Sequence, residues 1–253
     1  MKIMDIDSDA PFSNYGLYDL ESDLELFLPN TVIKFHRISD NAFSYFRKNS
    51  EGKIVEKIIP VKSQNLKIEL APIRPLNHPA RRTSHMFLHF DKEIYLSENS
   101  AASIFVHCPI EIGIFLVHDS NHDSLDWITC NPLNSRFGLY GSPDTGTLCK
   151  YAKVSLATDY SDSNSYLEGV MQIIVENTLS FGQSISKIVF QITDNAMYYQ
   201  DSKTIIEGIK ITMKKRAAVN IADVKTTSID TDWSMSPTWE DKTASTHMEM
   251  GLE

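Results

Sequence analysis

The chain lacks an apolar run long enough to cross a bilayer. Its longest nearly apolar stretch, residues 103–117, holds fifteen residues, whereas a transmembrane helix needs about 20. Pro109 and Gly113 interrupt any long helix there, and six β-branched residues favour an extended backbone. We interpret this stretch as the central strand, or a bent pair of strands, of a β domain, and we expect no membrane span.

Cysteine is also scarce. The three cysteines are an odd number in no metal-binding spacing, and they lie at Cys108, Cys130 and Cys149. Residues 1–11 are acidic and lack the apolar core of a secretory signal, and no Asn-x-Ser/Thr sequon occurs. Together these features predict a cytoplasmic protein with unpaired thiols and a flexible N-terminus over residues 1–11.

Catalytic and cofactor motifs are missing as well. The chain has no Gly-x-Ser-x-Gly, no phosphate-binding glycine loop and no paired zinc-type cysteines. The net charge of −9 argues against a nucleic-acid partner, since phosphate binding needs a basic face. We therefore expect no cofactor, and no motif identifies a reaction.

Helical periodicity is absent over any segment longer than ten residues, whereas short alternating segments recur about every ten residues. This pattern predicts an all-β protein. We expect an antiparallel meander over residues 12–70, a linker over 71–82, which holds three prolines, and an immunoglobulin-like or jelly-roll-like β-sandwich over 83–216.

The last 37 residues, 217–253, differ in composition from the rest. They hold seven acids against two lysines, ten Ser or Thr, and neither Phe nor Tyr. Such a segment buries too little apolar area to offset its ordering entropy, so we expect an acidic disordered tail from residue 226 and leave 217–225 open. Trp233 and Trp239 are its exceptions. Either they have no role or they form a short peptide that docks on another protein.

Glu111 is the polar exception within the apolar stretch. A buried carboxylate is costly unless it is paired or protonated, and Arg136 and Lys150 are cations on neighbouring predicted strands. With His107, these residues are the candidate ligand-binding set. The alternatives are an ion pair that fixes strand register, a ligand or acid–base site, and an exposed position without a special role.

Two histidines four residues apart give the best metal-ligand spacing. His118 and His122 are accompanied by Asp119 and Asp123. The segment is polar and predicted to be a loop, where this spacing carries little weight, so the simpler interpretation is a solvated acidic loop.

Several short motifs resemble an archaeal family known as domain of unknown function 432. They are residues 109–114 (PIEIGI), 136–141 (RFGLYG), 146–151 (GTLCKY), 175–177 (VEN) and 187–189 (KIV). Gly138 stands where the family pattern has Ala, and Lys150 stands where it has Arg. The resemblance covers about residues 15–215. It implies a soluble archaeal protein and supplies no activity.

Two functions from different classes are consistent with these features. The first is a non-enzymatic scaffold or protein-interaction module, in which exposed edge strands also allow a homodimer by edge pairing. The second is a small-ligand-binding protein or enzyme that uses a cleft near the 71–82 linker. The second hypothesis predicts that Glu111, His107, Arg136 and Lys150 meet in one concave pocket.

Overall fold

The computed structural model describes residues 11–62, 65–78, 81–132, 135–216 and 219–240. These residues form nineteen β-strands and no α-helix, which confirms the predicted all-β class. Within the same ranges, no helix has the length and apolar character needed to span a membrane.

The first of two β-sandwiches is built largely from the N-terminal part of the chain. One sheet is the predicted meander, in the order β2-β3-β4-β5, and the other has the order β1-β6-β9-β10. Between them lies a core of aromatic and aliphatic side chains, including the fully buried Phe35, Phe43, Tyr45 and Phe115. The strands are β1 (Gly16–Leu20), β2 (Leu24–Leu28), β3 (Thr31–Ser39), β4 (Ala42–Asn49), β5 (Ile54–Pro60), β6 (Leu66–Ile73), β9 (Glu111–His118) and β10 (Asn121–Ile128).

A four-stranded sheet packs on a seven-stranded one in the second sandwich. The first has the order β11-β12-β7-β15, and the second has the order β13-β8-β14-β17-β16-β19 with β18 also paired to β17. Two of the pairs, β7–β12 and β14–β17, are parallel. The strands are β7 (His85–Leu96), β8 (Ser100–Pro109), β11 (Arg136–Tyr140), β12 (Thr147–Val154), β13 (Leu156–Ala157), β14 (Glu168–Asn177), β15 (Gln183–Gln191), β16 (Met197–Gln200), β17 (Lys203–Arg216), β18 (Val219–Thr227) and β19 (Ser234–Met235).

The apolar stretch 103–117 is a bent pair of strands that joins the two sandwiches. It runs along β8 in the second sandwich, breaks at Pro109, and continues as β9, which pairs with β6 in the first. Residues 111–128 thus belong to the first sandwich, whereas we expected all of 83–216 to form the second. The return of the chain to the first sandwich was not predicted, because the pairing of β9 with β6 joins segments about forty residues apart in the sequence. Independent folding of the two units stays a prediction.

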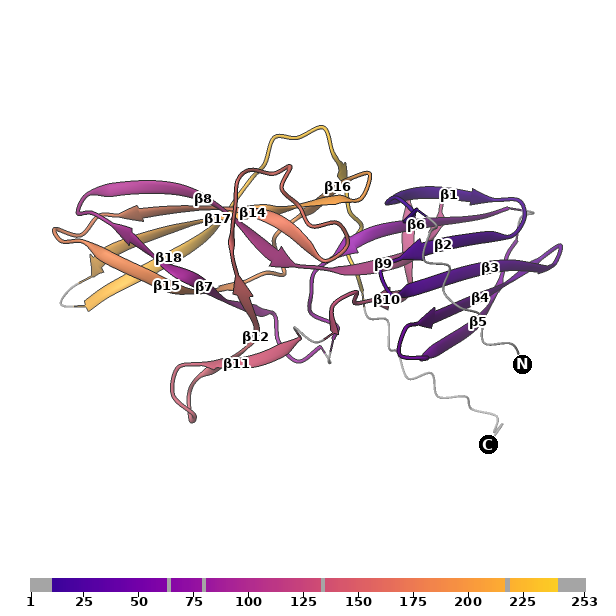
Figure 1. Cartoon of the computed structure of the whole chain (residues 1–253), viewed down its shortest axis with the longest axis horizontal. Coiled ribbons are helices and arrows are strands. Elements are labelled where there is room, and N and C mark those ends of the chain that lie inside the picture. The colour runs from indigo at the N-terminus through magenta and orange to yellow at the C-terminus, as the bar shows by residue number, and fades with distance from the viewer. Residues whose placement is uncertain (1–10, 63–64, 79–80, 133–134, 217–218, 241–253) are drawn as a thin grey trace.

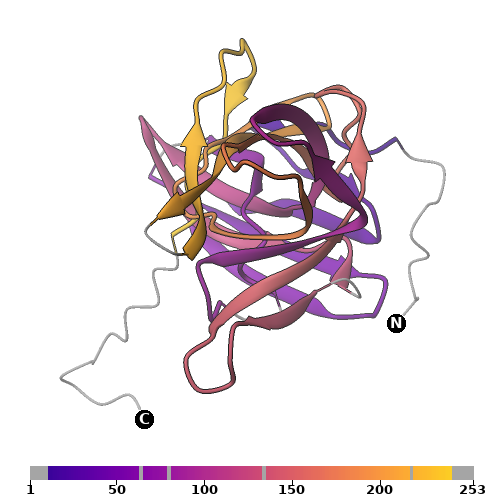
Figure 2. The same cartoon turned by 90° about the vertical axis from the view of Figure 1, so that its left-hand side faces the viewer.

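The two sandwiches lie end to end, so the molecule is elongated (Figure 1). The hairpin of β11 and β12 projects sideways near the middle. Viewed from its left-hand side, the molecule shows the β-strands of the two sandwiches one behind the other (Figure 2). The linker between β6 and β7 therefore passes the junction of the two bodies, which is where the charged residues described below gather.

The described part of the C-terminal segment is ordered, contrary to the tail predicted from residue 226. Strand β18 extends to Thr227 along β17, and β19 pairs with β16. Beyond β19, the Trp239 ring lies 5.7 Å from the Phe115 ring of the first sandwich. Residues 228–240, which we call the C-terminal strap, thus contact both sandwiches. Residues 241–253 and 1–10 lie outside the described residues.

Candidate functional site

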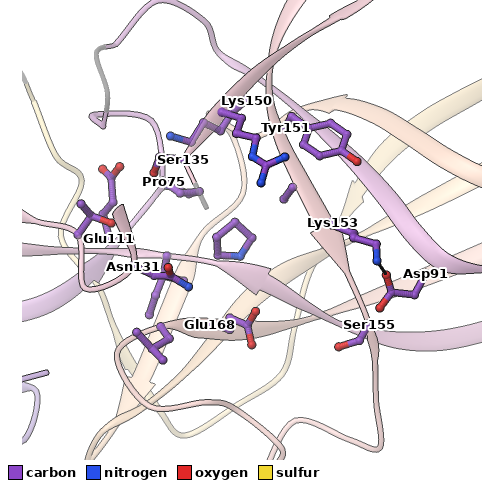
Figure 3. Close-up of a pocket in the computed structure, with 16 residues that line it drawn as sticks. Pro75, Asp91, Glu111, Asn131, Ser135, Lys150, Tyr151, Lys153, Ser155 and Glu168 are labelled. Carbon is purple, nitrogen blue, oxygen red and sulfur yellow. Dashed lines mark ion pairs between the residues drawn. The ribbon is translucent and has the colours of Figure 1, made fainter. Parts of the chain in front are cut away.

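A cavity of about 310 Å³ lies where the two sandwiches meet. Strand β9 contributes its first residue, β11 and β12 line another side, and the start of β14 lines a third. Three acidic and three basic side chains border the cavity: Asp91, Glu111, Glu168, Arg136, Lys150 and Lys153. Figure 3 shows this arrangement, with the ion pair of 2.8 Å between Lys153 and Asp91 at its edge.

Glu111 is 1% exposed and its carboxylate is held by three N–H donors. The backbone N–H and the side-chain amide of Asn77 each donate to Oε2 at 2.9 Å, and the backbone N–H of His78 donates to Oε1 at 2.8 Å. All three donors come from the proline-rich linker. The linker was predicted from residue 71, but residues 71–73 belong to β6 and pair with β9. Asn77 and His78 lie beyond this ladder, so their N–H groups are free to bind a carboxylate.

Lys150 reaches the same linker from β12. It is 3% exposed, and its amine donates to the carbonyl of His78 and lies 5.9 Å from the centre of the Phe137 ring. Among the described residues, Glu111 and Lys150 form no direct ion pair; the two charges attract across His78 instead. The expected cation is thus near Glu111, but backbone and amide groups hold the carboxylate.

Burial dominates the protonation of both groups. It raises the pKa of Glu111 to about 7, and this effect outweighs the N–H donors of His78 and Asn77 and the charge of Lys150, which act to lower the pKa. Burial also lowers the pKa of Lys150, against the opposing attraction of Glu111. Glu111 can therefore gain or lose a proton near neutral pH, as a general acid or base must.

Arg136 and Glu168 give the cavity two charged groups with unused hydrogen-bonding capacity. The Arg136 guanidinium is exposed and makes no hydrogen bond or ion pair with any residue that the structure describes. The Glu168 carboxylate accepts no hydrogen bond in the same ranges, and the Nδ1 atom of His107 lies 4.0 Å from it. Glu168 and Lys150 lie on opposite sides of the hollow in Figure 3.

His107 does not line this cavity, unlike the other three predicted residues. Its Nδ1 atom lies 4.0 Å from the Glu168 carboxylate and its Nε2 atom lies 3.6 Å from that of Asp162. Nδ1 is buried and has no hydrogen-bond partner among the described residues. The structure thus brings Glu111, Arg136 and Lys150 to one cavity. His107 lies outside it, next to the lining residue Glu168.

The four predicted metal ligands lie around the β9–β10 hairpin. His118 and Asp119 are exposed at its turn, whereas the Nε2 atom of His122 lies 2.7 Å from the buried carboxylate of Glu69. Asp123 follows on β10, so the segment from Asn121 is a strand, whereas we predicted a loop there. Over the ranges that the structure covers, no three His, Cys, Asp or Glu side chains are grouped to hold a metal ion.

Sequence reasoning missed Asn77, His78 and Glu168. Asn77 and His78 contribute mainly backbone N–H groups, which every residue carries, so side-chain chemistry could not single them out. The Asn-His pair inside a proline-rich segment was the available signal. Glu168 is the first residue of a strand that follows a polar loop. Many solvated carboxylates occupy such positions, so the sequence did not single it out.

Comparison with known proteins gives one family and no activity. A family model described as "Protein of unknown function (DUF432)" matches residues 14–251. No curated protein and no solved structure gives a significant match.

Proposed function

The chain belongs to the DUF432 family of proteins of unknown function, and we propose that it binds a small zwitterion, such as a free amino acid, in the cavity between its sandwiches. One observation carries the proposal: a cation and a carboxylate with unused hydrogen-bonding capacity, Arg136 and Glu168, border one cavity beside the buried Glu111 and Lys150. This combination develops the ligand-binding hypothesis drawn from the sequence.

The charges favour a ligand that carries both signs. Arg136 offers a planar fork of donors suited to a carboxylate, and the Lys150 amine has donors beyond the one that His78 accepts. Glu168 offers acceptor oxygens for an ammonium group. Because acids and bases are equal in number around the cavity, a ligand with one net charge would leave part of the lining unpaired, which is costly in a partly buried site.

The size of the cavity favours a small ligand. Ligand sites range from about 300 to 1,000 Å³, and this one is near the lower limit. Pro75, Pro109 and Ile110 form apolar parts of its wall and can cover an aliphatic side chain. Glu111 has a pKa of about 7, so its charge near neutral pH would depend on the charge of the ligand bound beside it.

Thermal unfolding in the presence of single amino acids tests the proposal. A ligand present at 100 times its dissociation constant stabilises the folded state by about 2.7 kcal/mol. In a protein of this size, that should raise the midpoint by about 5–10 °C. The substitution Arg136→Gln should remove the shift without affecting the core, since Arg136 is exposed and unpaired within the described chain.

The matched control is Arg82→Gln, an exposed arginine that lines none of the described cavities. It should keep the full shift. The proposal fails if none of the twenty amino acids shifts the midpoint, or if Arg136→Gln retains the shift.

An interaction module is the second candidate, and the projecting hairpin favours it. Strand β11 is an edge of its sheet, and Leu139, Tyr140 and Leu148 expose 45%, 53% and 39% of their surfaces on that hairpin. Antiparallel pairing of two β11 edges would give a symmetric homodimer. Light scattering after size exclusion should then show a dimer that Leu139→Lys converts to a monomer. A wild-type monomer at every concentration tested would contradict this candidate.

The remaining expectations from the sequence stay proposals. A cytoplasmic location is supported by three buried, free cysteines, and an archaeal source rests on the family resemblance. The ring of Trp239 contacts Phe115 of the same chain. A partner that binds through Trp233 and Trp239 must be compatible with this contact.

A further inference from the structure

A second cavity, of about 390 Å³, lies under the C-terminal strap. Its polar and aromatic lining consists of Arg74, Asn77 and Arg81 from the linker, Thr193, and Thr238, Trp239 and Glu240 from the strap. Pro75, which lies between Arg74 and Leu76, borders the first cavity instead. The linker therefore separates two cavities.

Arg74 is a half-buried guanidinium that uses little of its donor capacity. Its Nε donates to the carbonyl of Asn195 at 3.0 Å, which is its one hydrogen bond to the described residues. A guanidinium has five N–H donors. No carboxylate of these residues lies within ion-pair distance of it, so the remaining donors have no anionic partner.

A second arginine lies close enough to repel the first. Burial of Arg74 lowers its pKa, and the charge of Arg81, which borders the same cavity, also lowers it. The charge of Asp194 raises the pKa of Arg74 more than the charge of Arg81 lowers it, and Glu207 adds to this attraction, so burial is the main cause of the lowered pKa. Asp194 and Glu207 attract it from a distance, but an Asp194 oxygen accepts a hydrogen bond from Thr193 and Glu207 accepts one from the backbone of Ala196.

We propose that this second cavity binds an oxyanion, a phosphate or carboxylate group, between Arg74 and Arg81. Burial removes water from the Arg74 guanidinium, and an oxyanion bound between it and the exposed Arg81 would supply the acceptor oxygens and the negative charge that its free donors lack. Guanidinium groups bind carboxylate and phosphate in a bidentate manner, which matches the unused donors of Arg74.

The rest of the lining completes the oxyanion site. The hydroxyl group of Thr238 can donate to a further oxygen of the anion. Trp239 offers a flat wall for the organic part of a ligand that carries the oxyanion. Glu240 is the one carboxylate on the lining, and its exposed position lets it turn towards solvent.

This site is distinct from the zwitterion site, although Asn77 connects them. Asn77 borders the second cavity while its two N–H groups hold Glu111 in the first. The charged residues of the two cavities are otherwise different, so failure of one proposal leaves the other standing.

Trp239 makes the test direct because it lines the cavity. The double variant Trp127→Phe/Trp233→Phe leaves Trp239 as the only tryptophan of three. Titration of inorganic phosphate, and separately of malonate, at constant ionic strength should change its fluorescence in a saturable way. Saturation by phosphate alone or by malonate alone also supports the site and identifies the preferred oxyanion. Calorimetry on the wild-type chain provides the same test if the double variant does not fold.

Substitutions assign the anion to this cavity. Arg81→Gln removes one charged hydrogen-bond donor group and should weaken binding by about 10- to 100-fold. Arg82→Gln, its exposed neighbour outside the cavity, and Arg136→Gln, in the first cavity, should leave binding unchanged. The proposal is overturned if neither anion saturates the signal, if Arg82→Gln weakens binding as much as Arg81→Gln, or if Arg136→Gln alone abolishes it.

Discussion

A chain that ends at Thr227 should unfold at a temperature about 10 °C below that of the full-length protein. The truncation removes β19 from its partner β16 and removes Trp239 from its contact with Phe115. It also deletes the hydrogen bonds from Ser236 to Met197 and Pro72. Loss of a partly buried tryptophan and a short strand pair costs about 3 kcal/mol, which corresponds to this shift in a protein of about 250 residues.

Two further variants locate the effect. A chain that ends at Glu240 keeps all of these contacts and should unfold at the full-length temperature. Trp239→Ala in the full-length chain should reproduce most of the loss. An unchanged midpoint for the chain ending at Thr227 would mean that the strap contributes nothing, as the acidic composition of the segment first led us to expect.

Glu111→Gln should change the pH dependence of unfolding. In the folded protein the Glu111 pKa is about 7, above the ordinary value of 4.5. The folded state therefore binds this proton more tightly than the unfolded state does. The resulting stabilisation is complete below pH 4.5 and is lost as the pH rises through 7.

The size of this effect follows from the same values. The difference of 7 − 4.5 = 2.5 pKa units corresponds to about 3 kcal/mol. Wild type should thus lose about 3 kcal/mol of unfolding free energy relative to Glu111→Gln between pH 4.5 and 8. Urea unfolding of both proteins at several pH values measures the difference.

The control for this experiment is Glu56→Gln, at an exposed position on β5. Its stability relative to wild type should vary little with pH. A wild-type advantage over Glu111→Gln that grows with pH would contradict the expectation, because it would mean that Asn77, His78 and Lys150 stabilise the ionised carboxylate more than burial destabilises it.

Local sequence patterns predicted most of the strands. Residues 24–38, within the predicted meander, alternate in polarity and form β2 and β3, and Gly52 lies in the β4–β5 turn with a φ of +80°, a conformation that favours glycine. These features depend only on residues that are neighbours along the chain, so they can be recognised in a single sequence. The break at Pro109 was equally visible as a proline within an apolar stretch.

Pairings between distant segments could not be predicted in the same way. The return of β9 to β6 and the parallel pair β14–β17 depend on which edges are free after the other strands have formed. The strap illustrates a related limit. Its composition is poor in apolar residues, but Trp239 finds a partner in Phe115, which lies more than a hundred residues away.

The site was predicted in part for a physical reason. Glu111 and Lys150 attract attention because charged residues within apolar strands need partners, and this argument uses only local sequence. Gly113, in the same strand, has a packing role: atoms of the Phe115 ring and Ile73 would lie 2.6 and 2.8 Å from an added Cβ. Glu168 and the linker donors required the three-dimensional structure.

Saturation-transfer NMR on a mixture of the twenty amino acids tests the zwitterion site most directly, because it detects contact between protein and ligand without first identifying the ligand. Wild type should transfer saturation to the signals of one amino acid or a few related ones. Arg136→Gln should abolish that transfer, and Arg82→Gln should preserve it. No transfer to any amino acid with wild type, or equal transfer with Arg136→Gln, would contradict a zwitterion site at the junction of the two sandwiches.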